Sequence, residues 1–434
     1  MGPDGTGVSV ALATEGFPDD QTWSDDPAVL PLTTALRHVL ETDPKLQQSL
    51  ARVRIAEAEA LQARLLPNPV LTVVVRFREG GGSPIIAPSI AADLIAILRK
   101  PRQAMAADHA LQSAAADALA TAIDLIAETR KAYVDVQAQD ALLEALRERS
   151  SVVRRMVAVA KARLEAGDAT RLDLLTLQGQ QLTVEQEIAD AALERQSKRL
   201  ILLRLLGHPS GDLEYALDPL PDAPPETAVK ASEAQWMSAA MNHRPEIEAI
   251  GWNLAALGDQ EALAAFFPWD KLDAGIEAER DSAWSVGPSV ALPLPLFDTG
   301  DAAKQSAFAK RVEARHKLTA IRRQVLTEVR ISYRTFIAAG ASLTRVREQL
   351  LPVQVQRRDQ IEAAYKAGEV DLASLLLADN DVNDAREKLI ELRHRVSTAL
   401  TELERSVGGS GVAQNVAKSP ADFPSTGPAI HDRS

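Results

Sequence analysis

The longest stretch of this chain without proline or glycine, residues 102–166, constrains the fold more than any other feature. Pro101 precedes it and Gly167 follows it. At 1.5 Å of rise per residue, a helix of about 65 residues would be about 95 Å long, which is wider than a compact domain. Apolar side chains recur in it every three or four residues, and alanines flank that row. The sequence therefore predicts an elongated molecule with this helix wedged between others.

The chain reverses after this helix. Glycine adopts the left-handed conformation that ends many helices, and Gly167 is placed to do so. A second helical run over residues 170–206 then leads back. Together the two runs predict a long antiparallel hairpin over residues 101–206, with Pro101 opening its first helix.

Composition excludes several classes of function. The net charge of the 434-residue chain is -12, and its Lys and Arg residues are spread out, which argues against nucleic acid as a partner. Because the chain has no cysteine, disulfides, thiol chemistry and lipid attachment through Cys are ruled out for this sequence. No apolar run approaches the roughly 18 consecutive residues that a membrane-spanning helix needs, so we predict none. Residues 1–12 show no recognisable signal peptide.

Proline, glycine and periodicity divide the chain into four parts. We predict a disordered leader over 1–29, a first structural repeat over 30–225, a second repeat over 226–407 and a disordered tail over 408–434. The first repeat contains helices over 32–41 and 44–66, a strand pair within 70–98 (strands 70–78 and 89–98), the hairpin 101–206 and a proline-rich linker, 207–225.

The second repeat follows the plan of the first. Pro44 recurs as Pro245 and Gly167 as Gly368, each 201 residues later. A constant displacement over so long a span indicates an internal duplication. The second strand pair is predicted within 271–294 (strands 271–280 and 284–294) and the second hairpin within 299–407, bent at Gly340 and Pro352.

The predicted strands, except the one over residues 89–98, alternate in hydrophobicity. Leu71, Val73 and Val75 lie on one face of the first strand, and Thr72 and Arg76 on the other. Strands of about 9 to 11 residues with this alternation cross outer membranes as parts of β-barrels. We predict that six residues face lipid: Leu71, Val73, Val75, Leu272, Ala274 and Ile276. Four strands leave exposed edges in a bilayer, so other subunits must close the barrel.

Several short motifs, in their order and spacing, resemble the TolC-type outer-membrane efflux protein family over about residues 30–407. They are LLPNPVL at 65–71, RPEI at 244–247, GP at 287–288 followed by LPLPLFDTG at 292–300, and YKAG at 365–368.

The resemblance implies a mainly α fold with a small β part. Three copies would form long α-helical hairpins around a tunnel, and each would give four strands to a shared twelve-stranded transmembrane β-barrel. It also implies a homotrimer in outer-membrane lipid, with a periplasmic extension. The trimer would join a periplasmic adaptor protein to an inner-membrane pump of the resistance-nodulation-division or ABC type. The expected function is a passive conduit of a tripartite efflux or type I secretion system that exports small molecules, metals or proteins.

The hairpin turns are the first candidate site. Gly167, Asp168, Gly368 and Glu369 lie at the far end from the strands, where the adaptor would dock. Well-known relatives carry aspartates six and nine positions after the second turn glycine, where this chain has Ser374 and Leu377. Asp173 occupies the equivalent position of the first copy. Asp173, Asp379, Asp381 and Asp384 are possible tunnel-lining residues, although charged residues on helices more often form a solvated face.

Other residues suggest no chemistry. The seven histidines lack the spacing of shared metal ligands on a helix, and we find no catalytic constellation, metal site or cofactor site. Phe266, Phe267 and Trp269 form either a membrane-interface belt or a hydrophobic plug at the helix-to-strand junction.

The alternative function is a soluble coiled-coil scaffold or membrane-shaping protein. Such a scaffold gives no reason for strand pairs at equivalent points of two hairpins. Nothing in the sequence identifies the exported substrate.

Overall fold

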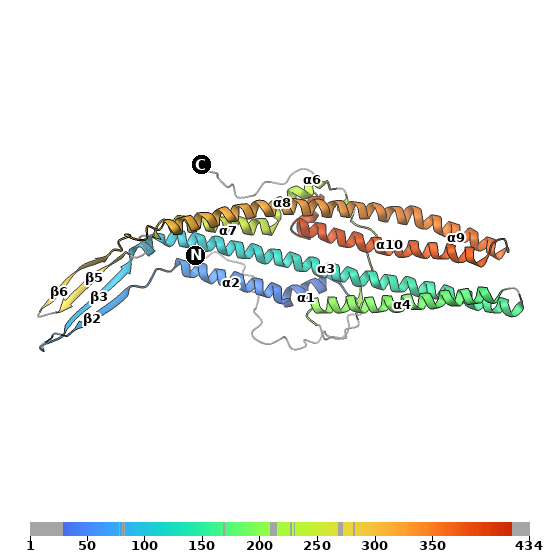
Figure 1. Cartoon of the computed structure of the whole chain (residues 1–434), viewed down its shortest axis with the longest axis horizontal. Helices are drawn as coiled ribbons and strands as arrows, with labels where there is room; N and C mark the ends of the chain where they lie inside the picture. The colour runs from blue at the N-terminus through green and yellow to red at the C-terminus, as the bar shows by residue number, and fades with distance from the viewer. Residues whose placement is uncertain are drawn as a thin grey trace, which may run out of the picture.

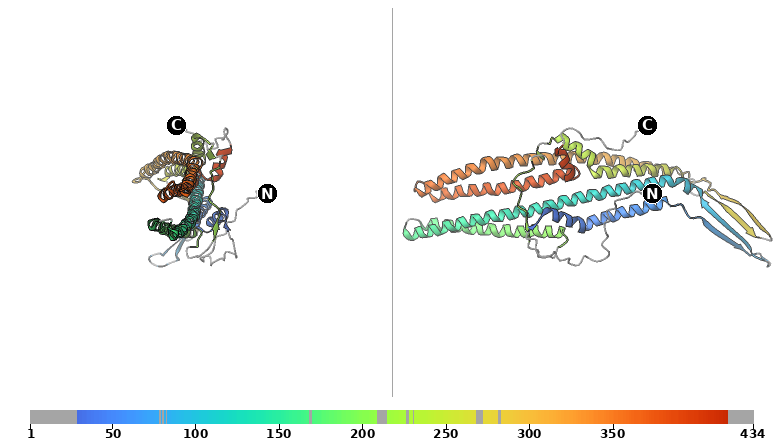
Figure 2. Two further views of the ribbon diagram at one scale, coloured as in Figure 1. Left: turned by 90° about the vertical axis from the view of Figure 1, so that its right-hand side faces the viewer. Right: turned by 180° about the vertical axis from the view of Figure 1, so that it is seen from behind.

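The protein is long and narrow, with a small sheet at one end and the tips of two helical hairpins at the other (Figure 1). The computed structural model describes residues 29–77, 79, 81, 83–167, 170–208, 215–225, 228–229, 231–267, 272–280 and 283–418. Views from the tip end and from behind show the same elongated bundle (Figure 2). The sheet and the tips are therefore separated by the full length of the helices.

The first repeat contains α1 (Leu32–Thr42), α2 (Pro44–Arg64), α3 (Leu94–Ala166) and α4 (Arg171–Leu205). Asp43 caps α2, since its carboxylate accepts bonds from the amides of Lys45 and Leu46, and Pro44 occupies the first helical turn. The predicted start of α3 is wrong. Asp93 caps the helix by accepting from the Ala96 amide at 2.9 Å, so Pro101 lies inside a helix of 73 residues.

The second repeat contains α6 (Glu233–His243), α7 (Pro245–Ala264), α8 (Asp301–Arg345), the π-helix η2 (Val346–Leu350), α9 (Leu351–Lys366), α10 (Leu372–Ser406) and α11 (Ser410–Lys418). α4 begins at residue 171 and α10 at residue 372, which reproduces the displacement of 201 residues. α11 contradicts the prediction of disorder directly after residue 407. It is an ordered helix because Ala413 and Val416 are buried in the core of the second repeat.

A π-helical turn over Val346–Leu350 interrupts the second long helix. In this helix, the buried residues Ala339, Leu343 and Val346 lie four and then three residues apart. The half-buried Leu351 follows five residues after Val346. A π turn accommodates one extra residue and keeps the apolar row on one side. Pro352 follows directly, whereas Gly340 lies inside α8. The bends expected at Gly340 and Pro352 therefore stay predictions.

Four antiparallel strands form the sheet at the end of the molecule. They are β2 (Val70–Arg76), β3 (Ile85–Asp93), β5 (Asp273–Arg280) and β6 (Trp284–Ala291), in the order β2-β3-β5-β6. The second strand ends at Asp93, and not at Leu98, because α3 has already begun at Leu94. The fourth strand ends at Ala291, before the predicted Leu294. Arg78 and Lys271, at two predicted strand ends, lie outside the described residues.

The two largest hydrophobic clusters of the described residues lie one in each repeat. The cluster of the first repeat gathers residues of α1, α2, α3 and α4, among them the buried Tyr133. The Tyr133 hydroxyl donates to the Leu30 carbonyl at 2.8 Å and accepts from the Asp218 amide at 3.0 Å, and burial raises its pKa to about 12. These bonds hold the parallel pair β1 (Val29–Leu30) and β4 (Ala216–Leu217). β1 begins at the last residue of the predicted leader, and β4 lies in the predicted linker.

One helix contradicts the expectation that none could span a membrane. α3 contains an 18-residue window that is long and apolar enough by composition alone. Alanine supplies much of that character, and α3 packs against α2, α4, α7 and α10 along its length. Of that window 28% is buried within the chain, and a single helix of this kind is weak evidence for a membrane span.

Candidate functional site

The four-stranded sheet has one apolar face. Directly paired residues of neighbouring strands share a face, so the register assigns every side chain to one side. The apolar face comprises Leu71, Val73, Val75, Ile86, Pro88, Ile90, Ala92, Ala274, Ile276, Ala278, Trp284, Val286, Pro288 and Val290. Arg280, at the end of β5, is the one charged residue on this face, and its guanidinium lies over the Trp284 ring.

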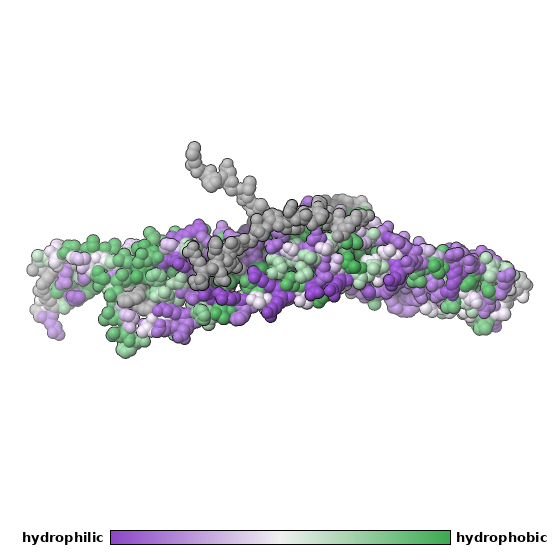
Figure 3. Space-filling model, turned by 90° about the horizontal axis from the view of Figure 1, so that it is seen from above, coloured by the Kyte–Doolittle hydropathy of each residue, from purple (hydrophilic) through white to green (hydrophobic). Residues whose placement is uncertain are grey.

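The opposite face holds the other charged and hydroxyl side chains of the sheet. They are Thr72, Arg76, Ser89, Asp93, Asp273, Glu277, Glu279, Ser285 and Ser289. Seen in Figure 3, the strand end of the molecule carries large hydrophobic areas, whereas the helices are mixed. The sheet therefore has the two-sided character of a barrel wall between lipid and water.

The register supports the proposed orientation of the first strand. Leu71, Val73 and Val75 are exposed and lie on the apolar face with Ala274 and Ile276. Leu272 directly precedes β5. That these residues face lipid stays a prediction. It is consistent with the register, which places apolar residues of all four strands on the same side of the sheet.

The junction between helices and sheet is also apolar. Phe267 is exposed and Phe266 half-buried at the end of α7, while Trp269 lies outside the described residues. Leu296 and Phe297, after β6, are exposed as well. Exposure of Phe267 favours the belt over the plug.

The two hairpin tips are built alike. Gly167 and Gly368 have φ angles of 83° and 78°, in the left-handed region. The amide of Glu369 bonds back to the Ala364 carbonyl at 2.9 Å, which closes the turn. Across the tips, the Arg163 guanidinium donates to the Tyr365 hydroxyl at 3.1 Å. Gly167, Gly368 and Glu369 are exposed at the end of the molecule, and Asp168 lies outside the described residues.

Asp173 forms a capping box with Thr170, the N-cap residue of α4. Its carboxylate accepts from the amide and hydroxyl of Thr170, and the Thr170 hydroxyl accepts from the Asp173 amide. These bonds lower the pKa of Asp173. In the second repeat the two residue types are exchanged, since Asp371 caps α10 by accepting from the amide and hydroxyl of Ser374. Ser374 is therefore one half of a capping pair at the start of α10, at the position equivalent to Asp173 of α4.

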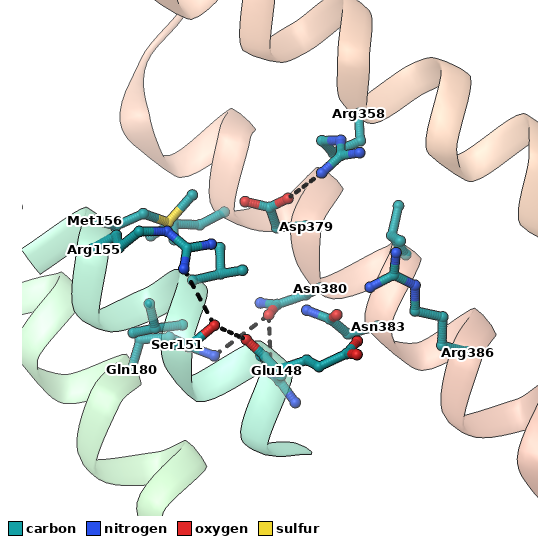
Figure 4. A pocket seen from close by; sticks show the side chains of 15 residues that line it. Glu148, Ser151, Arg155, Met156, Gln180, Arg358, Asp379, Asn380, Asn383 and Arg386 are labelled. Carbon is teal, nitrogen blue, oxygen red and sulfur yellow. Dashed lines mark hydrogen bonds and ion pairs between the residues drawn. The ribbon is translucent and has the colours of Figure 1, made fainter. Parts of the chain in front are cut away.

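The two hairpins enclose a groove between α3, α4, α9 and α10 with a cavity of about 270 Å³. Figure 4 shows Arg155, Arg358 and Arg386 around it, with Asn380 and Asn383 between the helices. Glu148 and Asp379 also line it. The groove is polar and mainly basic, and it lies on the side of the molecule that leads to the tips.

Arg149 joins three helices beside this groove. Its guanidinium lies 3.0 Å from Glu187 of α4, 3.1 Å from Asn380 and 3.5 Å from Glu387 of α10. The Arg149 side chain is only 10% exposed. Burial raises the pKa of Glu387, and Arg149 opposes that rise. Arg149 therefore links the first hairpin to the second.

We expect Arg149→Met to loosen the two hairpins. Removing the guanidinium leaves the carboxylates of Glu187 and Glu387 without a compensating positive charge. Because both carboxylates are partly exposed, we expect a loss of about 1–2 kcal/mol in the free energy of unfolding. Thermal unfolding, and hydrogen exchange of α10 amides around Asn380, would measure it. Arg154→Met is the matched control, since Arg154 is 60% exposed and lies 3.8 Å from Glu185. Equal losses in both variants would contradict the role of Arg149.

The acidic residues predicted as tunnel lining are mostly paired. Asp379 lies 3.8 Å from Arg358, and burial raises its pKa. Asp381 pairs with Arg357. Asp384 is exposed. None of these three residues contacts Asp173, which lies at the start of α4. The structure therefore does not support a single acidic ring formed by all four residues.

Contacts between residues far apart in sequence, which no motif predicted, join α3 to α10. Asp135 lies 2.6 Å from His394, and Asp124 lies 2.6 Å from Arg405. His38 and His208 stack with ring centroids 5.4 Å apart, although they are far apart in sequence. Among the described residues, no group of three or more His, Asp or Glu side chains could hold a metal ion.

Comparisons with known proteins agree with this architecture. A family model described as outer membrane efflux protein matches residues 87–208 and 226–409, one segment in each repeat. No curated protein matches the sequence.

Solved outer-membrane channels share the fold. The structure is similar to VceC of Vibrio cholerae, with a TM-score of 0.72 and 18% identity over 87% of this chain and 96% of that one. The outer-membrane channel OprN gives a TM-score of 0.70 and 19% identity over 89% and 91%. The open state of MtrE from Neisseria gonorrhoeae gives 0.68 and 17% over 94% and 98%. Such low identities establish the fold alone.

Proposed function

Because the chain belongs to the outer membrane efflux protein family, we propose that it forms a passive export conduit in which several copies surround one channel. The protein is an outer-membrane efflux channel. The observation that carries the proposal is the sheet with one apolar face and one polar face, attached to helices long enough to extend far from a bilayer. No step in this function needs a catalytic group.

The number of copies is argued from the sheet edges. Within the described residues, β2 and β6 each have a strand on one side only. A bilayer supplies no water to satisfy the free amides and carbonyls, so β2 of one copy must pair with β6 of the next until the barrel closes. Family resemblance favours three copies, giving twelve strands.

Partners follow from the same proposal. We propose that the tips around Gly167, Asp168, Gly368 and Glu369 contact a periplasmic adaptor protein, which joins the channel to an inner-membrane pump. The exposed, polar turns at the far end from the sheet support this choice. The cargo is a small molecule, a metal ion or a secreted protein, and the pump sets which.

We expect the purified protein to be a trimer in detergent and to conduct ions in a planar bilayer. A closed barrel has a water-filled lumen, whereas four unclosed strands should not persist in detergent with their strand content intact. Light scattering with detergent correction would give the mass, and single-channel recording the conductance. A folded monomer, or a trimer without conductance, would contradict the proposal.

The soluble scaffold is disfavoured by the sheet. A cytosolic coiled coil would expose the apolar face of four strands to water, with no protein segment among the described residues to cover it. Finding the full-length gene product in the soluble fraction would favour the scaffold instead.

A further inference from the structure

The groove between the two hairpins holds two arginines that have no carboxylate partner. Its cavity of about 270 Å³ is lined by residues of α3, α4, α9 and α10. The Arg155 guanidinium of α3 donates to the Ser151 hydroxyl at 3.3 Å. Among the described residues, no carboxylate lies within ion-pair distance of Arg155 or of Arg386 on α10. Two positive charges therefore border the same cavity without a negative charge paired to either.

The other charged residues of the lining do not reverse this sign. Arg149 already contacts carboxylates of α4 and α10, and the guanidinium of Arg358 lies 3.8 Å from Asp379. Glu148 is the remaining carboxylate of the lining, and it forms no ion pair within the described part of the chain. The unpaired groups are therefore two guanidiniums and one carboxylate, so the groove carries an excess of positive charge.

Hydrogen-bond donors accompany this charge. The amide side chains of Gln180, Asn380 and Asn383 line the groove. Arg149 lines it as well, with a side chain that is only 10% exposed, and its buried Nε atom has no hydrogen-bond partner. A buried donor without an acceptor is uncommon in folded proteins and calls for an explanation. An oxygen-rich ligand in the cavity would supply acceptors to these groups.

The π-helical turn η2 sets which arginine of α9 reaches the groove. Without an extra residue, the steps of four and three that end at Val346 would continue to Arg357. After η2, the half-buried row instead runs through Leu351, Val355 and Arg358. Arg358 lines the groove with a side chain that is 29% exposed, whereas Arg357 is 41% exposed and lies outside the lining. Short π turns inside helices are frequent at functional sites.

The first repeat does not share the polar lining that α10 supplies. Asn383 and Arg386 correspond, 201 residues earlier, to Leu182 and Glu185 of α4. The equivalent helix therefore has an apolar side chain and a carboxylate where α10 has an amide and a guanidinium. Because both helices form the same kind of hairpin, the fold itself does not require the groove residues of α10.

We propose that this groove binds a small polyanion whose phosphate or carboxylate oxygens are held between Arg155 of the first hairpin and Arg358 and Arg386 of the second. Figure 4 shows these three arginines on different sides of the groove. Guanidinium groups bind such oxygens through two parallel N–H···O bonds. Ligand pockets measure about 300–1,000 Å³, so this cavity suits a ligand at the small end of that range. The bound anion would join the two hairpins.

Calorimetric titration of the full-length protein in an uncharged detergent tests this site. The two probes are pyrophosphate, which presents phosphate oxygens, and citrate, which presents carboxylate oxygens, each at constant ionic strength. We expect saturable binding of at least one probe, and the tighter one identifies the class of oxyanion. Arg155→Met and Arg386→Met should each raise the Kd about ten- to a hundredfold, because each removes one charge-assisted interaction.

Two further variants give the test a sign and a control. Glu148→Gln should lower the Kd, because it removes the one unpaired carboxylate that faces the anion. Misfolding cannot produce such a gain of affinity. Arg154→Met is the matched control, since Arg154 precedes Arg155, is turned about 100° around α3 and lies outside the groove lining. Its Kd should equal that of the parent.

Four results would overturn the inference. They are the absence of saturable binding of both probes, binding that both Met variants leave unchanged, weaker binding by Glu148→Gln, and an equal loss in Arg154→Met and Arg155→Met. The last would show that the probes respond to overall charge and not to the groove. None of these results bears on the proposed export channel, whose test is the mass and conductance of the protein.

Discussion

Val73→Arg is expected to prevent stable insertion of the barrel, whereas Thr72→Arg, one residue away, should be tolerated. Val73 lies mid-strand on the apolar face opposite Pro88, and a charged side chain on the lipid face costs about 2–4 kcal/mol at the bilayer midplane. Thr72 lies on the polar face opposite Ser89, in a row that continues to Glu277. An arginine there has water and a carboxylate within reach.

The two variants are measured together. Folding into lipid vesicles, followed by urea titration, gives the free energy of unfolding of each variant relative to the parent. The adjacent positions share strand, depth and substitution, so the difference between them reports the face alone. Equal losses at both positions would contradict the assignment of faces, and a reversed order would place the lipid on the other side of the sheet.

The helical plan was predictable because its signals are local. Pro44 and Pro245 occupy the first helical turns of α2 and α7, and Gly167 and Gly368 take the left-handed turns predicted for them. The duplicated strands were also predictable, since their alternation needs no knowledge of neighbours. These elements depend on residues close in sequence.

The failures occur where a short apolar run fits both helix and strand. Residues 94–98 were predicted as strand, but Asp93 caps a helix there and the Leu94 amide bonds to the Leu272 carbonyl. That carbonyl belongs to the other repeat. α11 escaped prediction for a similar reason, because it is short and its order depends on burial against the second core.

The site was less predictable than the fold. Asp173 was proposed as tunnel lining from its position, yet its carboxylate is used in a cap with Thr170. The role of Arg149 was not predictable from the sequence, because its bond to Asn380 joins residues 231 positions apart. Only the packing of the two hairpins brings such pairs together.

Glu369→Trp is expected to abolish export while leaving the channel folded. Glu369 is exposed beside Gly368 at the end of the second hairpin, and its backbone amide, not its side chain, closes the turn on Ala364. A bulky side chain there adds no strain to the protomer, but it would hold an adaptor away from the tip. Asp168→Trp, at a position outside the described residues, makes the same change at the first hairpin.

Export by cells that supply the pump and adaptor is the functional readout, with thermal unfolding of the purified trimer as the structural one. Glu369→Gln is the matched control, because it removes the charge without adding bulk and should retain export. Loss of export with an unchanged melting temperature would identify the tip as the docking surface. Normal export by the Trp variants would show that docking occurs elsewhere. A lowered melting temperature would instead show that the turn itself is structural, because the substitution would then act on the fold and not on a partner.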